Sequence, residues 1–508
     1  YLAASAGAMA YRVLKDRDPD RAARALHIAK DDWAHAIVGE ETPETQSTPA
    51  FAATEMELAA VGILASLELY QVTGDRRYAE KARELAGVVV NSQQKSYVGD
   101  KFPLAGFFYT SPAKTDIFYQ FHRGSDQAPI VAMAKLCEAF PEHADWMQWY
   151  TVVALYSEYQ KASSVMTEPY GVLPAYVYRE SDSKRIAEGD RYASSRAAYR
   201  EQVLQGMPMG DGYYLKAFPV WFSRRGNYGV LLSQAKGLSA AAHLRGDLAA
   251  AELAQRQLQW VVGRNPFAQS TMWGEGYDFA QQYSVSSGDL VGSLPVGMLT
   301  RGNRDVPFWP PRNGYVYKEV WVHPSARWFW LMQDLFGAAL VEGRVPPGAA
   351  STVTFEHQLT GQVHAIEADV ATGRFHDFVP EGDYRVRCSD YQTHVTLLPA
   401  GMHTIDFGPG HFVHFSLSAE TMADDQLRLR LTATGVGGHR FAVRTYNLTP
   451  ALPEQEVELE PGTPVEVTWT ARIESTSTPW VTVVIPDDDI SQRRELYGAA
   501  LISSMSSR

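Results

Sequence analysis

Apolar residues recur with helical spacing over roughly the first two thirds of the chain. Within residues 51–90, one helical face carries the apolar residues Ala60, Ile63, Leu64, Leu67 and Tyr70. Gly74 follows this run and predicts the end of the helix, and a second helix is expected to begin near Arg77. This stretch therefore reads as two helices joined by a short turn.

The same helix–turn–helix pattern returns along residues 1–341. The expected pairs are residues 5–14 with 20–38, 126–140 with 144–160, and two helices within 227–263. Repeated hairpins of this length favour a toroid of helix pairs, of (α/α)6 type, over a small bundle. The pairs are separated by long aromatic and glycine-rich loops at 95–122, 164–226 and 264–318. Loops of this length in a compact domain usually carry function.

The pattern changes at residues 342–350, "EGRVPPGAA". Beyond it, apolar and polar residues alternate with period two, and turn residues interrupt them every 8–12 positions or so, as in an all-β domain. We therefore predict a multidomain α and β protein. Its parts are a helical toroid at 1–343, a β-sandwich of carboxypeptidase-regulatory-like or immunoglobulin-like type at 347–410, and a second β-sandwich at 411–500.

Composition narrows the classes of partner. The formal net charge of −12 disfavours nucleic acid and anionic membranes. We find no apolar run long enough to predict a membrane span. The 12 Trp and 26 Tyr residues suit either sugar-binding clefts or large cores. Cys137 and Cys388 are expected to be buried thiols in different domains, and no cofactor or metal-binding motif is present.

One acidic residue stands out in "YVYKEVWVHPSARWFWLMQDLF", residues 315–336. Glu319 precedes a strongly aromatic helix, and desolvation favours the protonated form of a carboxyl group. It is therefore either a proton donor or a structural acid that caps the helix or pairs with an arginine.

A second candidate stretch is "WVVGRNPFAQSTMWGEGYD", residues 260–278. Glycines alternate there with Trp273, Glu275 and Tyr277. Such alternation suits a loop that approaches a ligand closely, although an ordinary glycine-rich connection would look the same.

The order of these motifs resembles glycoside hydrolase family nine. The resemblance rests on "GRNP", then "G-x-LVG", a Gly/Asn/Asp loop, "YKEV" and the closing aromatic helix. It extends to "EMELAAVGILASLELYQVTGDRRYAEKA" (55–82) and to the hairpin of 2–33. It implies a six-hairpin barrel and a glycosidase in which Glu319 is the general acid.

The chain also departs from that family. Lys318 stands where the family usually has Asn, and no His-His-Arg segment follows "GRNP". The family's Asp-Ala-Gly-Asp motif, which positions the hydrolytic water, is absent. We therefore expect the chain to begin inside a longer protein whose N-terminal part supplies the base and the remaining helices.

Asp126 is the candidate second carboxylate within the chain. It lies in "FHRGSDQAP" (121–129), where His122 and Arg123 suit contacts to sugar hydroxyls or a carboxylate. Asp126 is expected more readily as the N-cap of the next helix. Asp211 and Asp289 are weaker candidates, because Gly-Asp pairs usually form turns.

Several arginines lie close to Glu319 in the sequence, and they bear on whether the substrate is charged. Arg301, Arg304, Arg312 and His323 favour an acidic or decorated glycan, unless the arginines pair with Asp305, Asp289 or Glu275. The remaining candidate substrate contacts are Trp309 and Tyr317.

These observations predict a secreted, periplasmic or cell-surface glycosidase with an inverting mechanism and a carbohydrate substrate. Two alternatives stay open: a polysaccharide lyase on a similar toroid, and a glycan-binding scaffold without activity. The sequence does not predict an oligomeric state.

Overall fold

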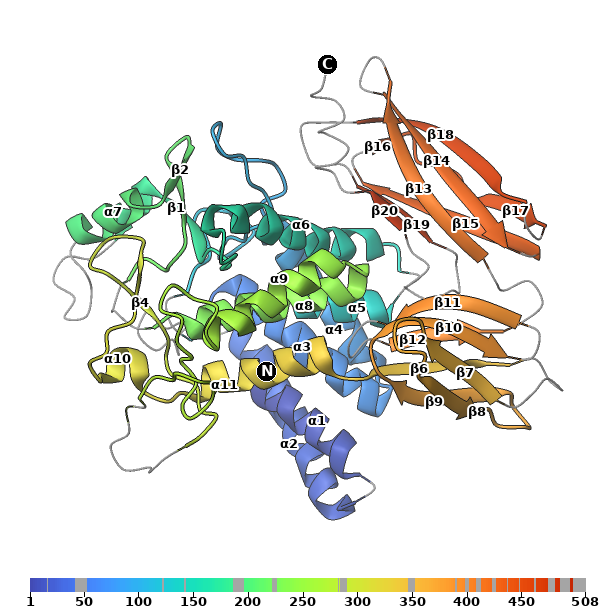
Figure 1. The fold of residues 1–508 in the computed structure, drawn as a ribbon, viewed down its shortest axis with the longest axis horizontal. Helices are drawn as coiled ribbons and strands as arrows, with labels where there is room; N and C mark the ends of the chain where they lie inside the picture. The colour runs from blue at the N-terminus through green and yellow to red at the C-terminus, as the bar shows by residue number, and fades with distance from the viewer. Residues whose placement is uncertain are drawn as a thin grey trace. The chain divides into compact units, whose positions relative to one another are not determined.

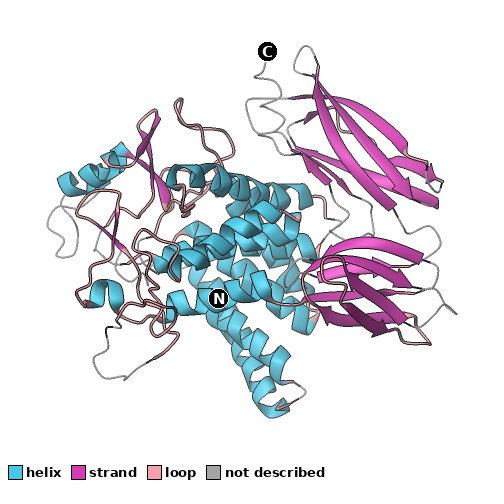
Figure 2. Ribbon diagram, viewed as in Figure 1, coloured by secondary structure: helices cyan, strands magenta, loops and turns pink. Residues whose placement is uncertain are grey.

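The computed structural model shows a mixed helix and sheet protein (Figure 2). It describes residues 1–15, 17–41, 53–120, 123–140, 143–185, 196–221, 226–281, 283, 290–345, 352–388, 391–397, 402–407, 413–422, 426–435, 437–446, 448–460, 463–473, 480–484 and 494–496. The chain forms two compact units, Tyr1–Ala241 with Glu252–Trp328, and Ala242–Ala251 with Phe329–Arg508. Each unit is described by itself.

Helices dominate the first unit and are coloured blue to yellow in Figure 1. Their bounds are α1 Leu2–Leu14, α2 Pro19–Glu41, α3 Glu55–Thr73, α4 Arg76–Ser92, α5 Gln127–Ala139, α6 Trp146–Ser164, α7 Arg196–Leu204, α8 Tyr228–Arg245, α9 Leu248–Val261, α10 Tyr315–Lys318 and α11 Val322–Phe336. The helix pairs expected from the sequence are all present as α1–α2, α3–α4, α5–α6 and α8–α9.

Local sequence sets the ends of α3 and α4. Thr54 and Glu57 form a reciprocal capping box at the start of α3, which satisfies two otherwise free N–H groups. Gly74 ends α3 at a φ of 69°, where a residue with a Cβ atom would be strained. Asp75 then caps α4 by accepting a hydrogen bond from the Arg77 N–H. The predicted turn at this position is confirmed.

The interior of this unit is built from helix on helix. Helix α3 packs against α1, α4 and α5, and α5 packs against α6. Helix α6 buries five aromatic residues, Trp146, Trp149, Tyr150, Tyr156 and Tyr159, and is buried around most of its circumference, as expected of an interior helix.

Among the described helices, α3 is the one whose length and apolar composition would allow it to cross a membrane. Its most apolar window is 56% buried within the protein, and buried core helices pass the same test.

Loops and short strands gather at one end of the helices (Figures 1 and 2). They include the 3-10 turns η2 Val165–Thr167 and η3 Glu180–Arg185, and the strands β1 Tyr176–Arg179, β2 Met207–Gly210, β3 Tyr213–Lys216, β4 Leu299–Thr300 and β5 Pro307–Phe308. A tyrosine-rich core that includes Tyr176, Tyr178 and Tyr199 joins this region to α8. The candidate residues near Glu319 also lie in these connecting segments.

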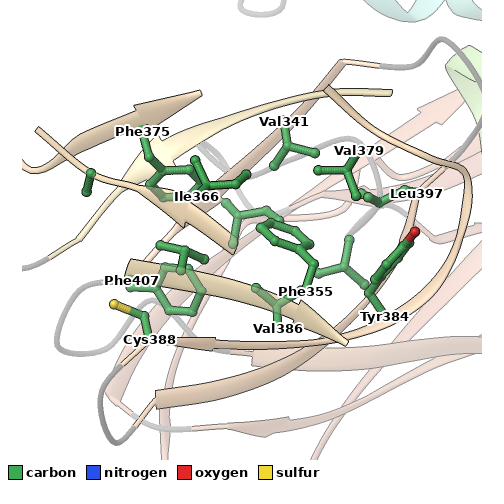
Figure 3. Packing of buried hydrophobic residues seen from close by; sticks show 14 of the residues in the cluster. Val341, Phe355, Ile366, Phe375, Val379, Tyr384, Val386, Cys388, Leu397 and Phe407 are labelled. Carbon is green, nitrogen blue, oxygen red and sulfur yellow. The ribbon is translucent and has the colours of Figure 1, made fainter. Parts of the chain in front are cut away.

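The second unit contains two groups of strands. The first comprises β6 Ala339–Arg344, β7 Thr352–His357, β8 Val363–Glu367, β9 Arg374–Val379, β10 Gly382–Cys388, β11 Tyr391–Leu397 and β12 Met402–Asp406. They form sheets of order β11-β10-β7-β8 and β12-β6-β9, and one buried cluster draws residues from both. Phe355 lies near the middle of that cluster (Figure 3). Strand β6 begins at Ala339, inside the range we predicted for the toroid.

The second group comprises β13 Val413–Thr421, β14 Gln426–Gly435, β15 Gly437–Tyr446, β16 Leu448–Thr449, β17 Gln455–Leu459, β18 Val465–Ile473, β19 Trp480–Val484 and β20 Arg494–Leu496. Its sheets have the orders β13-β14-β18-β16 and β17-β15-β19-β20. Leu427, Leu429 and Leu431 of β14 alternate inward to a common core with Phe441 of β15, which is the period-two pattern read from the sequence.

Candidate active site

Glu319 lies on an extended segment that directly follows α10. Its φ of −62° and ψ of 136° end the helix there. The segment pairs with residues 294–297: the Val296 N–H donates to the Glu319 carbonyl oxygen at 2.8 Å, and the Trp321 N–H donates to the Leu294 carbonyl oxygen at 3.2 Å. Successive side chains of an extended segment point to opposite faces. Glu319 and Trp321 therefore share one face, and Lys318 and Val320 share the other.

The Glu319 carboxyl group is held by a tryptophan. Trp321 Nε1 donates a hydrogen bond of 2.8 Å to Glu319 Oε2. The side chain is half-buried, and among the described residues no ion pair and no second hydrogen bond engages this carboxyl group. The structural interpretation of Glu319 as the partner of an arginine is therefore not supported, and Oε1 remains open to a ligand.

Replacing Trp321 by phenylalanine tests whether that hydrogen bond positions the acid. Phenylalanine keeps an aromatic ring but loses the N–H donor, and a hydrogen bond to an ionisable group is worth about 1.5–3 kcal/mol. We expect kcat to fall about tenfold or more, with KM nearly unchanged. Trp309→Phe is the matched control, because it removes an indole donor that bonds Gln269 Oε1 instead of Glu319. An equal loss of kcat in both variants would contradict the assignment.

Two basic side chains adjoin Trp321. The Arg123 guanidinium carbon lies 5.7 Å from the centre of the Trp321 ring, and the His323 ring centre lies 5.6 Å from it. Burial lowers the pKa of His323, and the positive charges of Arg327 and Arg123 lower it further. His323 is therefore neutral at neutral pH. His122, the other predicted contact here, lies outside the described residues.

Asp126 does not cap the helix that it precedes. It occupies the N-cap position of α5, but its side chain accepts no capping hydrogen bond. Instead Oδ1 accepts a hydrogen bond of 2.7 Å from the Tyr176 hydroxyl group, and the residue is only 6% exposed. The N-cap interpretation is therefore wrong. A tertiary contact with a residue far along the chain has replaced the local one.

Burial also controls the ionisation of Asp126. The pKa of Asp126 is raised to about 7, mainly by desolvation, although the Tyr176 hydrogen bond acts in the opposite direction. Glu57 raises the pKa further and Arg327 lowers it. The second oxygen, Oδ2, is buried without a hydrogen-bond partner among the described residues. Asp126 is thus a buried carboxyl group that changes charge near neutral pH.

Arg327 of α11 ties the segment before α5 to the helix that follows Glu319. Its Nη2 donates to the Gly124 carbonyl oxygen at 2.7 Å, and its Nη1 donates to the His323 carbonyl oxygen at 3.3 Å. Burial lowers the pKa of Arg327, and the charge of Asp126 raises it. This arginine and Tyr176 were not predicted. The sequence did offer one indication for Arg327: it lies one helical turn after His323, a spacing that places both side chains on the same face of the helix.

A small cavity of about 10 Å³ lies on the Lys318 face of the segment, which is the face opposite Glu319. Lys318 is 3% exposed, and its lowered pKa results from that burial. The ammonium group lies 5.3 Å from the Trp309 ring centre and donates to the Pro311 carbonyl oxygen at 3.1 Å. The cavity is about large enough for one water molecule. Trp273 Nε1, which belongs to its lining, is buried without a partner among the described residues.

Among the described residues, several predicted substrate contacts form no hydrogen bond or ion pair with Glu319. Trp309 and Tyr317 are each 6% exposed, so little of either ring is open to a ligand in this conformation. Tyr317 donates to the Arg312 carbonyl oxygen at 2.6 Å. Glu275 is exposed and Tyr277 is fully accessible on the glycine-rich loop. Asp211 lies in the turn between β2 and β3, as expected for a Gly-Asp pair.

The arginines of the 301–312 loop have no carboxylate partner among the described residues. Asp305 instead pairs with buried Lys216 at 3.0 Å and accepts hydrogen bonds from the Ala217 and Phe218 N–H groups. Pairing of the arginines with Asp305 or Glu275 is therefore wrong, and Asp289 lies outside the described residues. Arg301, Arg304 and Arg312 are exposed. Within the described part of the chain, no group of three or more His, Cys, Asp or Glu side chains is arranged to hold a metal ion.

Comparison with solved structures returned relatives of low identity. The cellulase Cel9M of C. cellulolyticum is 15% identical, with a TM-score of 0.37, over 65% of this chain and 61% of that chain. A GH9 protein of Bacteroides ovatus is 15% identical, with a TM-score of 0.38, over 65% of this chain and 52% of that chain. An endoglucanase from the termite Nasutitermes takasagoensis is 14% identical, with a TM-score of 0.38, over 65% and 63% of the two chains.

This chain thus spans less than two thirds of each of these three proteins. No match was found among curated protein sequences. The family model for Glycosyl hydrolase family 9 matches residues 1–332 of the 508. The matched range contains the helix pairs, the segment that carries Glu319 and most of α11. Because the match covers more than half of the chain, this protein belongs to glycosyl hydrolase family 9.

Proposed function

We propose that this protein hydrolyses glycosidic bonds of a polysaccharide or oligosaccharide, with Glu319 as the general acid. The observation that carries the proposal is the state of the Glu319 carboxyl group. It lies within the family match, is half-buried, is oriented by Trp321 and is not neutralised by any described cation. A structural acid would ordinarily be paired or would cap a helix.

Glycoside hydrolysis needs two carboxyl groups. Glu319 in its protonated form gives its proton to the leaving oxygen as the glycosidic bond breaks. A second carboxylate takes a proton from the water that attacks the anomeric carbon. In an inverting enzyme this water attacks from the opposite face of the sugar, so a β-linked substrate gives an α-anomer. We propose the inverting course for this protein.

Asp126 is poorly suited to act as the base that takes a proton from the attacking water. A base must be ionised and must reach water, whereas Asp126 is buried and titrates near pH 7. The family resemblance assigns the base to an Asp-Ala-Gly-Asp motif, which this chain does not contain. We therefore propose that Asp126 has a structural role, in which its buried carboxyl group accepts the hydrogen bond from Tyr176.

The proposal extends to the architecture around the site. The helix pairs would form part of a six-hairpin toroid, and the two groups of strands would form two β-sandwich domains that act as spacers or docking modules. A polysaccharide is met outside the cytoplasm, so we propose a secreted, periplasmic or cell-surface location.

A digest of a glycan panel tests this function. The full chain is incubated with neutral and acidic β-linked polysaccharides, and new reducing ends are measured. The anomer first formed is assigned by nuclear magnetic resonance. We expect reducing ends with inverted configuration on at least one glycan. Unsaturated uronate products would indicate a lyase, and binding without product would indicate a scaffold, so either result would overturn the proposal.

A further inference from the structure

We infer that Arg123 forms a subsite for a sugar carboxylate, and that the natural substrate is an acidic glycan containing uronic acid residues. This inference rests on the proposed function and adds the class of substrate to it. It is carried by the position of Arg123 over Trp321 and by the charges around that ring.

The Arg123 side chain contacts the Trp321 ring but has no described carboxylate to neutralise its charge. Its guanidinium carbon lies 5.7 Å from the Trp321 ring centre, and the side chain is exposed. No described carboxylate forms an ion pair with it. A cation–π contact of this kind does not use the N–H groups of the guanidinium as hydrogen-bond donors. An arginine whose N–H groups are not engaged by a carboxylate can bind the carboxylate of a ligand through two parallel hydrogen bonds.

The ring beneath Arg123 connects it directly to the proposed acid. Trp321 contacts Arg123 with its ring and donates its N–H group to Glu319 Oε2. A carboxylate bound by Arg123 would therefore be fixed within about one sugar unit of the bond that Glu319 protonates. This arrangement matches a uronic acid, whose carboxyl group is attached to the ring itself.

The surrounding charges favour an anion at this place. Arg327 and Arg123 both act on His323 strongly enough to lower its pKa after burial, which indicates positive potential beside Trp321. The acids nearby do not neutralise these cations: Glu319 accepts its hydrogen bond from Trp321 and forms no ion pair with a described residue, and Asp126 is buried against Tyr176.

The local charge contrasts with that of the whole chain. The formal net charge of the protein is −12, which repels acidic polymers at long range. The 301–312 loop nevertheless exposes Arg301, Arg304 and Arg312 with no carboxylate partner in the described part of the chain. Exposed arginines of this kind act only as screened charges, so a preference for an acidic sugar requires a direct contact such as the one proposed for Arg123.

Binding of two matched oligosaccharides tests the inference. One is a neutral β-linked gluco-oligosaccharide, and the other is the same oligosaccharide oxidised at C6 to carry glucuronate. Affinities are measured by calorimetry on the full chain with Glu319→Gln, which prevents turnover. We expect the glucuronate form to bind about tenfold tighter or more at low salt, and the advantage to shrink as ionic strength rises.

Substitution of single arginines tests whether glucuronate is bound by a direct contact with Arg123 or attracted by the positive charge of the surface as a whole. Arg123→Gln is expected to abolish the preference for glucuronate over the neutral sugar, and Arg123→Lys is expected to retain part of that preference. Arg304→Gln removes the same charge from the exposed loop and is the control. Its effect on the preference should be below about twofold, because an exposed charge that does not contact the sugar is screened by salt ions.

Three results would overturn the inference: no preference for glucuronate, equal losses in Arg123→Gln and Arg304→Gln, or no binding of either sugar. The proposed function is judged separately by the panel digest. Hydrolysis of neutral glycans without any preference for glucuronate would leave that function standing and remove only the acidic substrate.

Discussion

Glu319→Gln is expected to lower kcat by about 10²–10⁴-fold on a natural glycan, with KM changed little. The amide keeps the shape of the side chain and still accepts the hydrogen bond from Trp321 Nε1 through its oxygen. It cannot give a proton to the leaving oxygen, so the departing sugar must leave as an alkoxide. Initial rates on the best glycan of the panel measure the effect.

A substrate with an activated leaving group makes this test specific for acid catalysis. A dinitrophenyl glycoside releases a stable phenolate and needs no proton, so Glu319→Gln should lose far less activity on it than on the natural glycan. Glu275→Gln is the control, because Glu275 is an exposed carboxylate on the glycine-rich loop. Equal losses on both substrates would show that Glu319 is not the proton donor.

Local sequence signals predicted the helical part of this protein well. The start and end of α3 depend on Thr54, Glu57 and Gly74, which lie within one turn of the positions that they determine. The helix pair around them was therefore predictable, as was the turn at Asp211. The strands of the second unit followed from period-two alternation, since each is half-buried.

The site was only partly predictable, because its contacts join segments far apart in the chain. Glu319 was singled out from the sequence by its aromatic surroundings, but the pairing of its backbone with residues 294–297 was not visible in the sequence. That pairing decides which side chains share its face. Trp309 and Tyr317 appeared to be ligand contacts because they are aromatic and near Glu319 in sequence, whereas the structure buries both.

Asp126 shows most clearly why a local pattern can mislead. An acid directly before an apolar helix is an N-cap by every local criterion. Its carboxyl group instead meets Tyr176, which lies 50 residues later. The buried carboxyl group and Arg327 then form a pair of ionisable groups that no local pattern in the sequence reveals.

Asp126→Asn is expected to stabilise the protein increasingly as pH rises. The native pKa is about 7 and the ordinary value is 3.8, so the folded state holds this proton more tightly than the unfolded state does. The wild type therefore loses stability between about pH 4 and pH 7 and is level above that range. Three pKa units correspond to about 4 kcal/mol. Asparagine does not ionise, and its Oδ1 still accepts the Tyr176 hydrogen bond, so the variant should escape this loss.

Urea unfolding followed by the helical signal in far-ultraviolet circular dichroism measures the difference between variant and wild type at each pH. We expect the difference to grow from about pH 4 to pH 7 and then to stay constant. Asp211→Asn is the matched control: Asp211 is exposed in a turn with φ of 52°, which asparagine tolerates, so its stability should run parallel to the wild type. If Asp126→Asn also ran parallel to the wild type, Asp126 would not change charge in this range. Its carboxyl group would then have to be ionised throughout this range in the folded state as well as in the unfolded state, because only then does neither state take up or release a proton.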